Sequence, residues 1–259
     1  MMRVLHIARR EWLEQRRQPA MLAVISSLYV LMSLVVLTPL AGLQYIASDA
    51  GLVDTLNRML GDAINPEAFI DTSAGFVLLT FNFLVFTQFL GIAAVMAGHT
   101  VLHDRQTGTL PFLLLSPVKR FELFTGKVLG AMGPAFVLYV VVSGSTALAL
   151  LLFPVTSAHP AYLPSAPAWW VAFLWGGPAW GVFIATICTM VSSLATDVRT
   201  SQQGVWFVMF FGQFLCGLLL TNSLPDGLPT MLTVAVLGTL SAAAALFVGS
   251  LLFRRDLGR

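Results

Sequence analysis

The chain has 259 residues, of which 57% are hydrophobic and only 10% are charged. Soluble domains carry about 25% charged residues, so this composition excludes a soluble globular protein and predicts an all-α membrane protein. The formal net charge is only +2, and no nucleic-acid partner is expected.

The N-terminal segment, residues 1–19, is expected to form an amphipathic helix in the lipid headgroup layer. At about 100° per residue, one face carries the apolar side chains of Val4, Leu5, Ala8 and Trp12. The opposite face carries Arg3, Arg10, Glu14 and Arg17. Alternatively, this segment only supplies positive charge that orients the chain in the membrane.

Six membrane-spanning helices are expected, because a charge-free stretch of about 20 apolar residues can cross a bilayer. Five charge-free stretches occur, and the longest is divided by the proline-rich segment PVTSAHPAYLPSAP, which predicts a loop. The expected spans are residues 20–45, 73–98, 128–153, 168–194, 204–222 and 230–253. The first is much longer than the apolar region of a signal peptide, about 7–15 residues, so we expect it to be retained.

The positive residues are distributed unequally between the two sides of the predicted membrane. All 14 Lys and Arg residues except Arg58 fall on the side that holds both termini. Positive residues gather on the cytoplasmic side, so we expect both termini in the cytoplasm and the chain in a bacterial inner membrane. This asymmetry also accounts for the positive charge without nucleic acid.

The loop between the first two spans is the longest one expected outside. It carries Leu52, Leu56, Met59 and Leu60 at helical spacing. A short surface helix is therefore predicted there, either as a simple connector or as a contact for a periplasmic partner.

The predicted spans contain no Asp, Glu, Lys or Arg, although ion-coupled carriers commonly keep such groups at depth. The sequence also lacks a P-loop and the usual hydrolase motifs, so we expect neither enzymatic activity nor a cofactor in this chain. His99 and His103 have no evident third ligand, and no metal site is predicted. Cys188 and Cys216 are expected to be apolar packing residues.

Mild polar residues remain inside the spans. Asn82, Gln88 and Gln213 either form hydrogen bonds between helices or line a substrate path. Gly126, Gly130 and Gly133 are expected to let another helix approach closely.

Residues 99–127, between the second and third spans, combine charge with a short apolar run. Ser116 and Pro117 are typical of a helix start, and the helix is expected to end near Gly126. Phe121 and Phe124 would then share one face, while Arg120 and Lys127 project elsewhere. Such a helix is suited to insert into a groove of a partner protein.

The segment DRQTGTLPFLLLSPVKRFELFTGKVLGA resembles the first cytoplasmic loop of ABC-2 type transporter permeases. The matching residues are Asp104, Gly108, Thr109, Leu110, Pro117, Arg120, Glu122, Leu123, Gly126 and Lys127. The segments SSLATDVRTSQQ and IARREW are similar to the second loop and the connecting helix of that family. Asp104 stands where glutamate is usual, and the short loop between the last two spans differs from members with re-entrant helices there.

The resemblance implies a permease subunit of an exporter that pairs with a second copy or a homologue. Separate ABC ATPase subunits would bind ATP and Mg and dock on the loop as a coupling helix. The coupling residues would be Asp104, Gly108, Thr109, Pro117, Arg120, Phe121, Glu122, Phe124 and Lys127. The alternatives are an ATP-independent channel or secondary carrier, or a membrane assembly factor.

Overall fold

The computed structural model describes residues 2–16, 19–60, 65–109, 118–195 and 197–256. Over these residues the chain forms helices joined by short turns, without a β-strand. The α-helices are α1 (Met2–Arg16), α2 (Pro19–Ser48), α3 (Ala50–Leu60), α4 (Pro66–Gln106), α6 (Arg120–Leu138), α7 (Gly144–Leu150), α8 (Pro167–Val171), α9 (Gly177–Leu194), α10 (Val198–Val208), α11 (Phe214–Asn222) and α12 (Leu228–Asp256).

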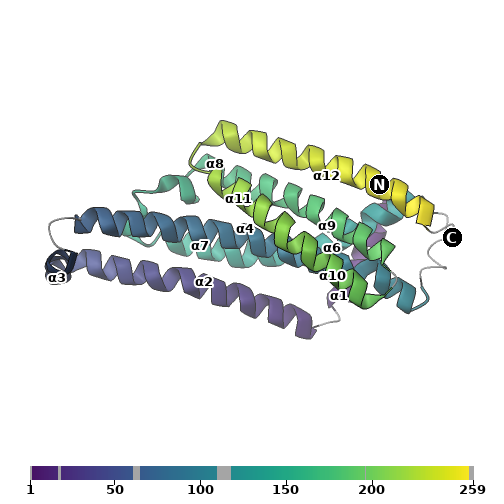
Figure 1. Cartoon of the computed structure of the whole chain (residues 1–259), viewed down its shortest axis with the longest axis horizontal. Helices are drawn as coiled ribbons and strands as arrows, with labels where there is room; N and C mark the ends of the chain where they lie inside the picture. The colour runs from purple at the N-terminus through teal and green to yellow at the C-terminus, as the bar shows by residue number, and fades with distance from the viewer. Residues whose placement is uncertain (1, 17–18, 61–64, 110–117, 196, 257–259) are drawn as a thin grey trace.

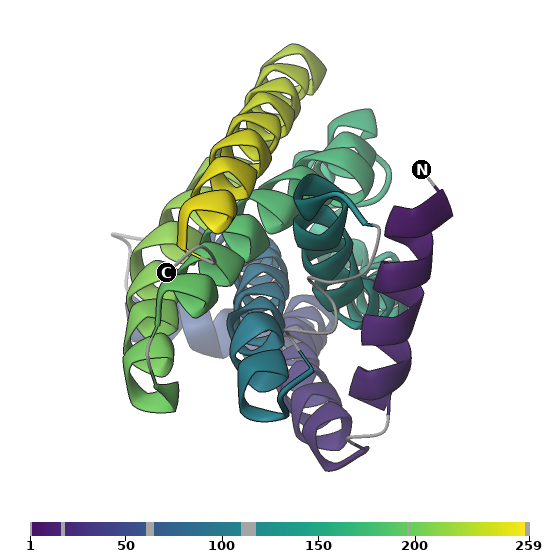
Figure 2. The same ribbon diagram turned by 90° about the vertical axis from the view of Figure 1, so that its right-hand side faces the viewer.

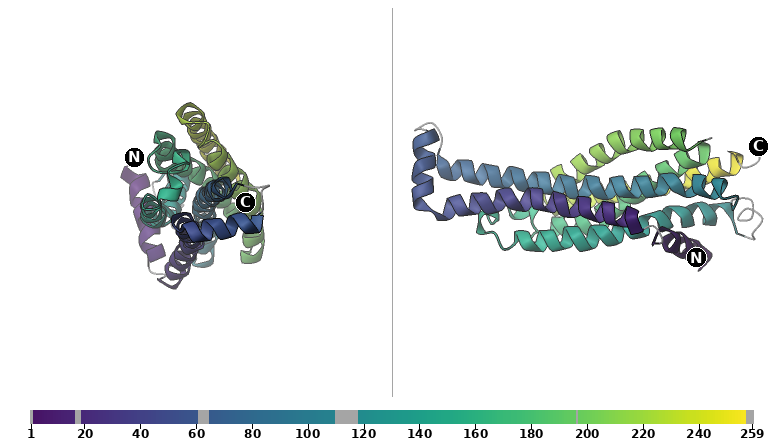
Figure 3. Two further views of the ribbon diagram at one scale, coloured as in Figure 1. Left: turned by 90° about the vertical axis from the view of Figure 1, so that its left-hand side faces the viewer. Right: turned by 90° about the horizontal axis from the view of Figure 1, so that it is seen from below.

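The long helices lie side by side in one elongated bundle (Figure 1). Helix α1 lies across one end, which also holds the C-terminal end of α12 (Figure 2). Helix α3 lies across the opposite end (Figure 3). The predicted surface helix after the first span is thus present, and it carries Arg58 at the end away from α1. Below, the two ends are called the α1 end and the α3 end.

Five helical segments within the described residues have the length and apolar composition to cross a membrane. They are Pro66–Asp104, Arg120–Val141, Pro160–Leu194, Arg199–Asn222 and Leu228–Phe253. They correspond to the last five predicted spans. The first predicted span lies on α2, which has 30 residues and no charged residue, and the count of six stays a prediction. The proline-rich loop is confirmed as two short 3₁₀ turns, Pro154–Thr156 and Pro160–Tyr162.

The prediction of a separate helix ending near Gly126 is wrong. Helix α6 runs without a break from Arg120 to Leu138, so it begins well before the predicted third span. Glycine ends a helix when it adopts a positive φ, but Gly126 has none and is buried against α1. The expected start of that helix, Ser116 and Pro117, lies outside the described residues.

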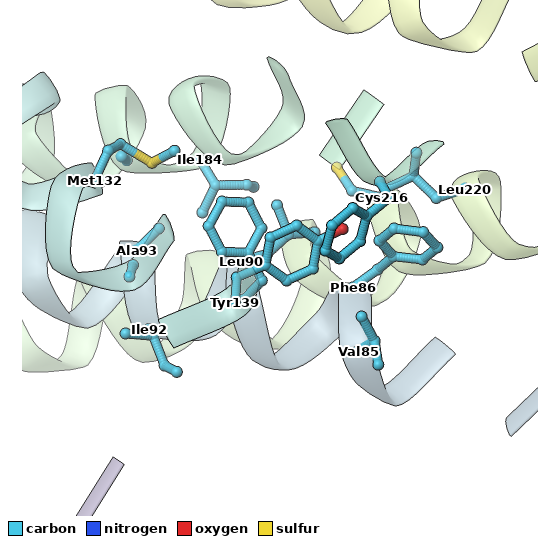
Figure 4. Packing of buried hydrophobic residues seen from close by; sticks show 14 of the residues in the cluster. Val85, Phe86, Leu90, Ile92, Ala93, Met132, Tyr139, Ile184, Cys216 and Leu220 are labelled. Atoms are coloured by element: carbon cyan, nitrogen blue, oxygen red, sulfur yellow. The ribbon is translucent and has the colours of Figure 1, made fainter. Parts of the chain in front are cut away.

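Three of the spans contain a π-helical turn that the sequence did not indicate. These turns are Tyr139–Ser143, Ala172–Gly176 and Met209–Gln213. The first two bring Tyr139 and Phe173 together in the core, with ring centroids 4.6 Å apart. Tyr139 also stacks on Phe89 of α4 at 4.4 Å, and Figure 4 shows it among the buried apolar side chains. These aromatic contacts join α4 to the third and fourth spans.

Candidate functional site

Helix α1 packs on α6 along a strip of glycines. A Cβ atom at Gly126 would lie 2.7 Å from Ile7 Cγ2, and one at Gly130 would lie 2.5 Å from Glu11 Cβ and 3.2 Å from the carbonyl oxygen of Ala8. Distances this short leave no room for a side chain. The predicted close approach of a helix is therefore confirmed at Gly126 and Gly130, and α1 is that helix. At Gly133 an added Cβ would make only an ordinary contact, 3.8 Å from Trp12.

The face of α1 that packs on α6 overlaps only in part with the predicted apolar face. Of the four predicted residues, Val4 and Ala8 have their backbone carbonyls against the glycines of α6. Ile7 and Glu11 meet α6, whereas Leu5 and Trp12 are 58% and 41% exposed. The sequence pattern placed the apolar side chains together, but the small residues of α6 decide which side of α1 comes closest.

We expect Gly130→Ala to loosen α1 from α6, because its Cβ would collide with Glu11 and with the α1 backbone. The expected loss is about 1–3 kcal/mol of stability, typical of overpacking, seen as a lower melting temperature in detergent and faster tryptic cleavage of α1. Gly133→Ala is the matched control, since its Cβ would make an ordinary 3.8 Å contact with Trp12. Equal effects of the two substitutions would contradict the close contact at Gly130.

Three charged side chains from three helices meet between α1, α4 and α6. The Nζ atom of Lys127 donates to Glu11 Oε1 at 2.8 Å and also to Asp104 Oδ2. A third, longer contact joins Nζ to the carbonyl oxygen of Thr100 at 3.4 Å. The three side chains are 0%, 7% and 3% exposed for Lys127, Glu11 and Asp104. We call this group the charge cluster.

Asp104 also anchors the turn that follows α4. Thr109 Oγ1 donates to Asp104 Oδ1 at 2.9 Å, and the Thr109 N–H donates to the Asp104 carbonyl at 3.0 Å. Gly108 makes the turn possible because its φ of +67° is one that glycine adopts without strain. Four residues singled out in the sequence, Asp104, Gly108, Thr109 and Lys127, therefore belong to one local structure.

The charge cluster places one lysine between two carboxyl groups in a buried site. Burying charges is costly, and the attraction between them compensates only when the geometry is good and the remaining hydrogen-bonding groups are satisfied. Here the three hydrogens of the Lys127 ammonium group face three acceptors, and Asp104 accepts a further bond from Thr109. The site is therefore a defined junction between three helices.

Two serines extend the connections of α4 at the same end. The Leu102 N–H donates to Ser192 Oγ of α9 at 3.2 Å, and Ser201 Oγ of α10 donates to the Gly98 carbonyl at 3.1 Å. Together with the charge cluster, these bonds join the final turns of α4 to α1, α6, α9 and α10. A displacement of α6 at this end would therefore be passed to several helices.

A family model described as "ABC-2 family transporter protein" matches residues 5–251. The chain belongs to the ABC-2 transporter family. Neither the comparison with curated proteins nor the comparison with solved structures gave a match. As a member of this family, the chain is a multi-pass membrane component of a transporter. This component has no ATPase site of its own and associates with an ABC ATPase.

The resemblance placed nine coupling residues on this ABC-2 protein, and the structure divides them into different environments. Phe121 is 49% exposed, but Phe124 is fully buried, its ring centroid 5.6 Å from that of Phe253. The expectation that both rings face a partner is wrong for Phe124, because α12 covers its side of α6. Lys127, expected among the coupling residues and on a different face from the two rings, is buried in the charge cluster.

The first turn of α6 is polar and accessible. Arg120 is exposed, and Glu122 Oε2 accepts a hydrogen bond from the Lys119 N–H at 3.0 Å. This bond satisfies one of the free N–H groups at the helix start, and the carboxylate also opposes the positive end of the helix dipole. Glu122 thus has a local structural role in addition to its predicted role in coupling. Pro117 lies outside the described residues.

The three predicted pathway residues do not share one environment. Asn82 is buried, and its side chain accepts from Trp169 Nε1 and donates to the Tyr162 carbonyl, each at 3.0 Å. This geometry favours the alternative interpretation, a hydrogen bond between elements. Gln213 of the third π turn lies against α4, since a Cβ at Gly91 would come 2.5 Å from its Oε1. Gln88 is half-buried on α4.

Sequence reasoning missed Glu11. Its signal was an acidic residue continuing the helical spacing of Val4, Ile7 and Ala8 within a basic segment. Its partner Lys127 was placed just outside the predicted third span but lies within the helical segment Arg120–Val141. The described residues contain no group of three His, Cys, Asp or Glu able to hold a metal ion. Cys188 and Cys216 are buried and unpaired by disulfide.

Proposed function

We propose that this ABC-2 protein is the permease subunit of an ATP-driven exporter in a bacterial inner membrane, with its α1 end in the cytoplasm. The distribution of Lys and Arg supports this orientation, because Arg58 alone lies on the predicted outer side. ATP and Mg would be bound by the partner ATPase, and the permease itself would need no cofactor.

The observation that carries the coupling proposal is the position of Phe121. Its exposed ring lies on the first turns of α6, the same helix that holds Lys127 in the charge cluster and continues into the third span. A partner that grips Phe121 and the neighbouring Arg120 and Glu122 would move α6 directly. The charge cluster would then pass that movement to α1 and α4.

A second permease copy or a homologue would complete the translocation path. Our proposed contact surface is the exposed aromatic face of the fifth span, formed by Trp206, Phe207, Phe210 and Phe211. Gln88 and Gln213 remain the proposed pathway residues, and Asn82 would support them by fixing the outer loop. Helix α3, with Met59 80% exposed, is the surface that we assign to a possible periplasmic partner.

Site-specific photo-crosslinking in native membranes tests the function and the orientation together. A photoreactive amino acid at position 121 is expected to crosslink to an ABC ATPase, and the same group at position 59, at the α3 end, is expected not to. Crosslinks from position 59 alone would reverse the orientation. A functional chain that crosslinks to no ATPase from either position would favour an ATP-independent channel or carrier.

A further inference from the structure

A groove of about 440 Å³ lies between α1 and α6. Leu5, Trp12 and Leu13 of α1 line it, together with Leu129, Gly130 and Gly133 of α6. Gly133 has no side chain to fill the space beside Trp12, where an added Cβ would lie 3.8 Å from the indole ring. The volume falls within the range of sites for small ligands, about 300–1,000 Å³. We call this the α1–α6 groove.

The lining is apolar with one exception, the basic side chain of Arg9. Arg9 is exposed, as are Leu5, Trp12 and Leu13 on the same side of α1. On α6, the apolar surface continues away from Arg9 through Leu129 and Val137, which are 38% and 46% exposed. The groove therefore has a positive end and an apolar extension along a predicted membrane span.

This combination matches the chemistry of one phospholipid molecule. Amphipathic helices at a membrane surface insert apolar side chains among the lipids and keep basic residues near the headgroups. Helix α1 lies across the end of the bundle, as such a helix would (Figure 2). An arginine binds a phosphate group through paired hydrogen bonds, and an anionic lipid adds attraction for positive charge.

We propose that the α1–α6 groove is a binding site for an anionic phospholipid. The phosphate lies at Arg9, and one acyl chain follows Leu129, Gly133 and Val137 along α6. A lipid accounts for the apolar extension better than a protein segment, because the extension continues along a helix long enough to cross the bilayer. The site is independent of the ATPase surface at Phe121.

Tryptophan quenching by brominated lipids tests this proposal, because Trp12 is part of the groove. The full chain would be reconstituted in phosphatidylcholine vesicles that contain increasing fractions of brominated phosphatidylglycerol or brominated phosphatidylcholine. The difference between the native chain and Trp12→Phe isolates the signal of Trp12. We expect half-quenching of Trp12 at an about fivefold lower fraction of the anionic lipid, from the attraction of one basic residue near a charged membrane surface.

Three comparisons determine whether the preference belongs to the groove. Trp170, similarly exposed at 44% on α8, is expected to show no preference when isolated by Trp170→Phe. Arg9→Gln should remove the preference of Trp12, whereas Lys119→Gln, at an exposed position that does not line the groove, should preserve it. Gly133→Leu should fill the groove and reduce quenching of Trp12 by both lipids.

The proposal is overturned if Arg9→Gln retains the anionic preference, since the attraction would then come from the general surface charge. It is also overturned if Trp12 is quenched by neither lipid, which would mean that protein covers the groove. Equal anionic preference at Trp12 and Trp170 would exclude a specific site in the same way.

Discussion

Replacing Lys127 by Met is expected to destabilise the protein by about 3–5 kcal/mol, because it leaves Glu11 and Asp104 buried without their shared partner. Methionine is similar to lysine in length and does not open a large cavity. The loss therefore arises mainly from the uncompensated carboxylates. The measurement is the melting temperature of the purified chain in detergent, followed by its tryptophan fluorescence.

Two further variants separate charge from packing at this site. Lys119→Met changes an exposed lysine of the same segment and is expected to have almost no effect. The triple variant Glu11→Gln, Asp104→Asn and Lys127→Met removes all three charges, and we expect it to recover most of the stability, since neutral replacement of a buried ion pair is often tolerated. A single Lys127→Met variant as stable as the native chain would contradict the buried cluster.

The triple variant also distinguishes a structural junction from a coupling element. If the charge cluster passes movement from α6 to α1 and α4, the neutral variant should fold, associate with its ATPase and permit ATP hydrolysis with little transport. Full transport by a folded neutral variant would limit the cluster to a role in assembly. The result is informative because stability and coupling are measured on the same protein.

The positions of most helices follow from the sequence because a charged side chain inside the bilayer is costly. Charge-free stretches therefore mark spans, and the prolines between residues 154 and 167 mark the break between two of them. These features depend on neighbouring residues or on the membrane, and neither requires knowledge of which helices meet.

The features that the sequence did not reveal depend on contacts between distant helices. Phe121 and Phe124 are alike in the sequence, and only the position of α12 buries one of them. Glu11 and Lys127 are separated by more than a hundred residues, and the glycines of α6 bring them together. The π turns likewise have no local sequence signal. The candidate site could therefore be located on the first loop but not divided into buried and accessible residues.

Because Phe124 is buried and Phe121 is accessible, replacing each by alanine is expected to affect stability very differently. Phe124→Ala is expected to cost about 3–5 kcal/mol, as for other fully buried phenylalanines. The ring packs on Phe253 and fills the space beside Gly249, where an added Cβ would lie 2.6 Å from Phe124 Cζ. Phe121→Ala should change stability by less than about 1 kcal/mol, because the side chain is half exposed in the isolated chain.

The functional consequences should be reversed between the two variants at equal amounts of folded protein. Phe121→Ala is expected to weaken association with the ATPase and reduce ATP-dependent transport at least tenfold, consistent with an aromatic anchor worth about 2 kcal/mol at an interface. Folded Phe124→Ala should associate normally, because its side chain is covered by α12 and does not reach a partner. Melting temperature, ATPase co-purification and transport in vesicles measure the three effects. Unchanged association and transport in Phe121→Ala would remove the first turns of α6 from the coupling surface, even if Phe124→Ala behaves as expected.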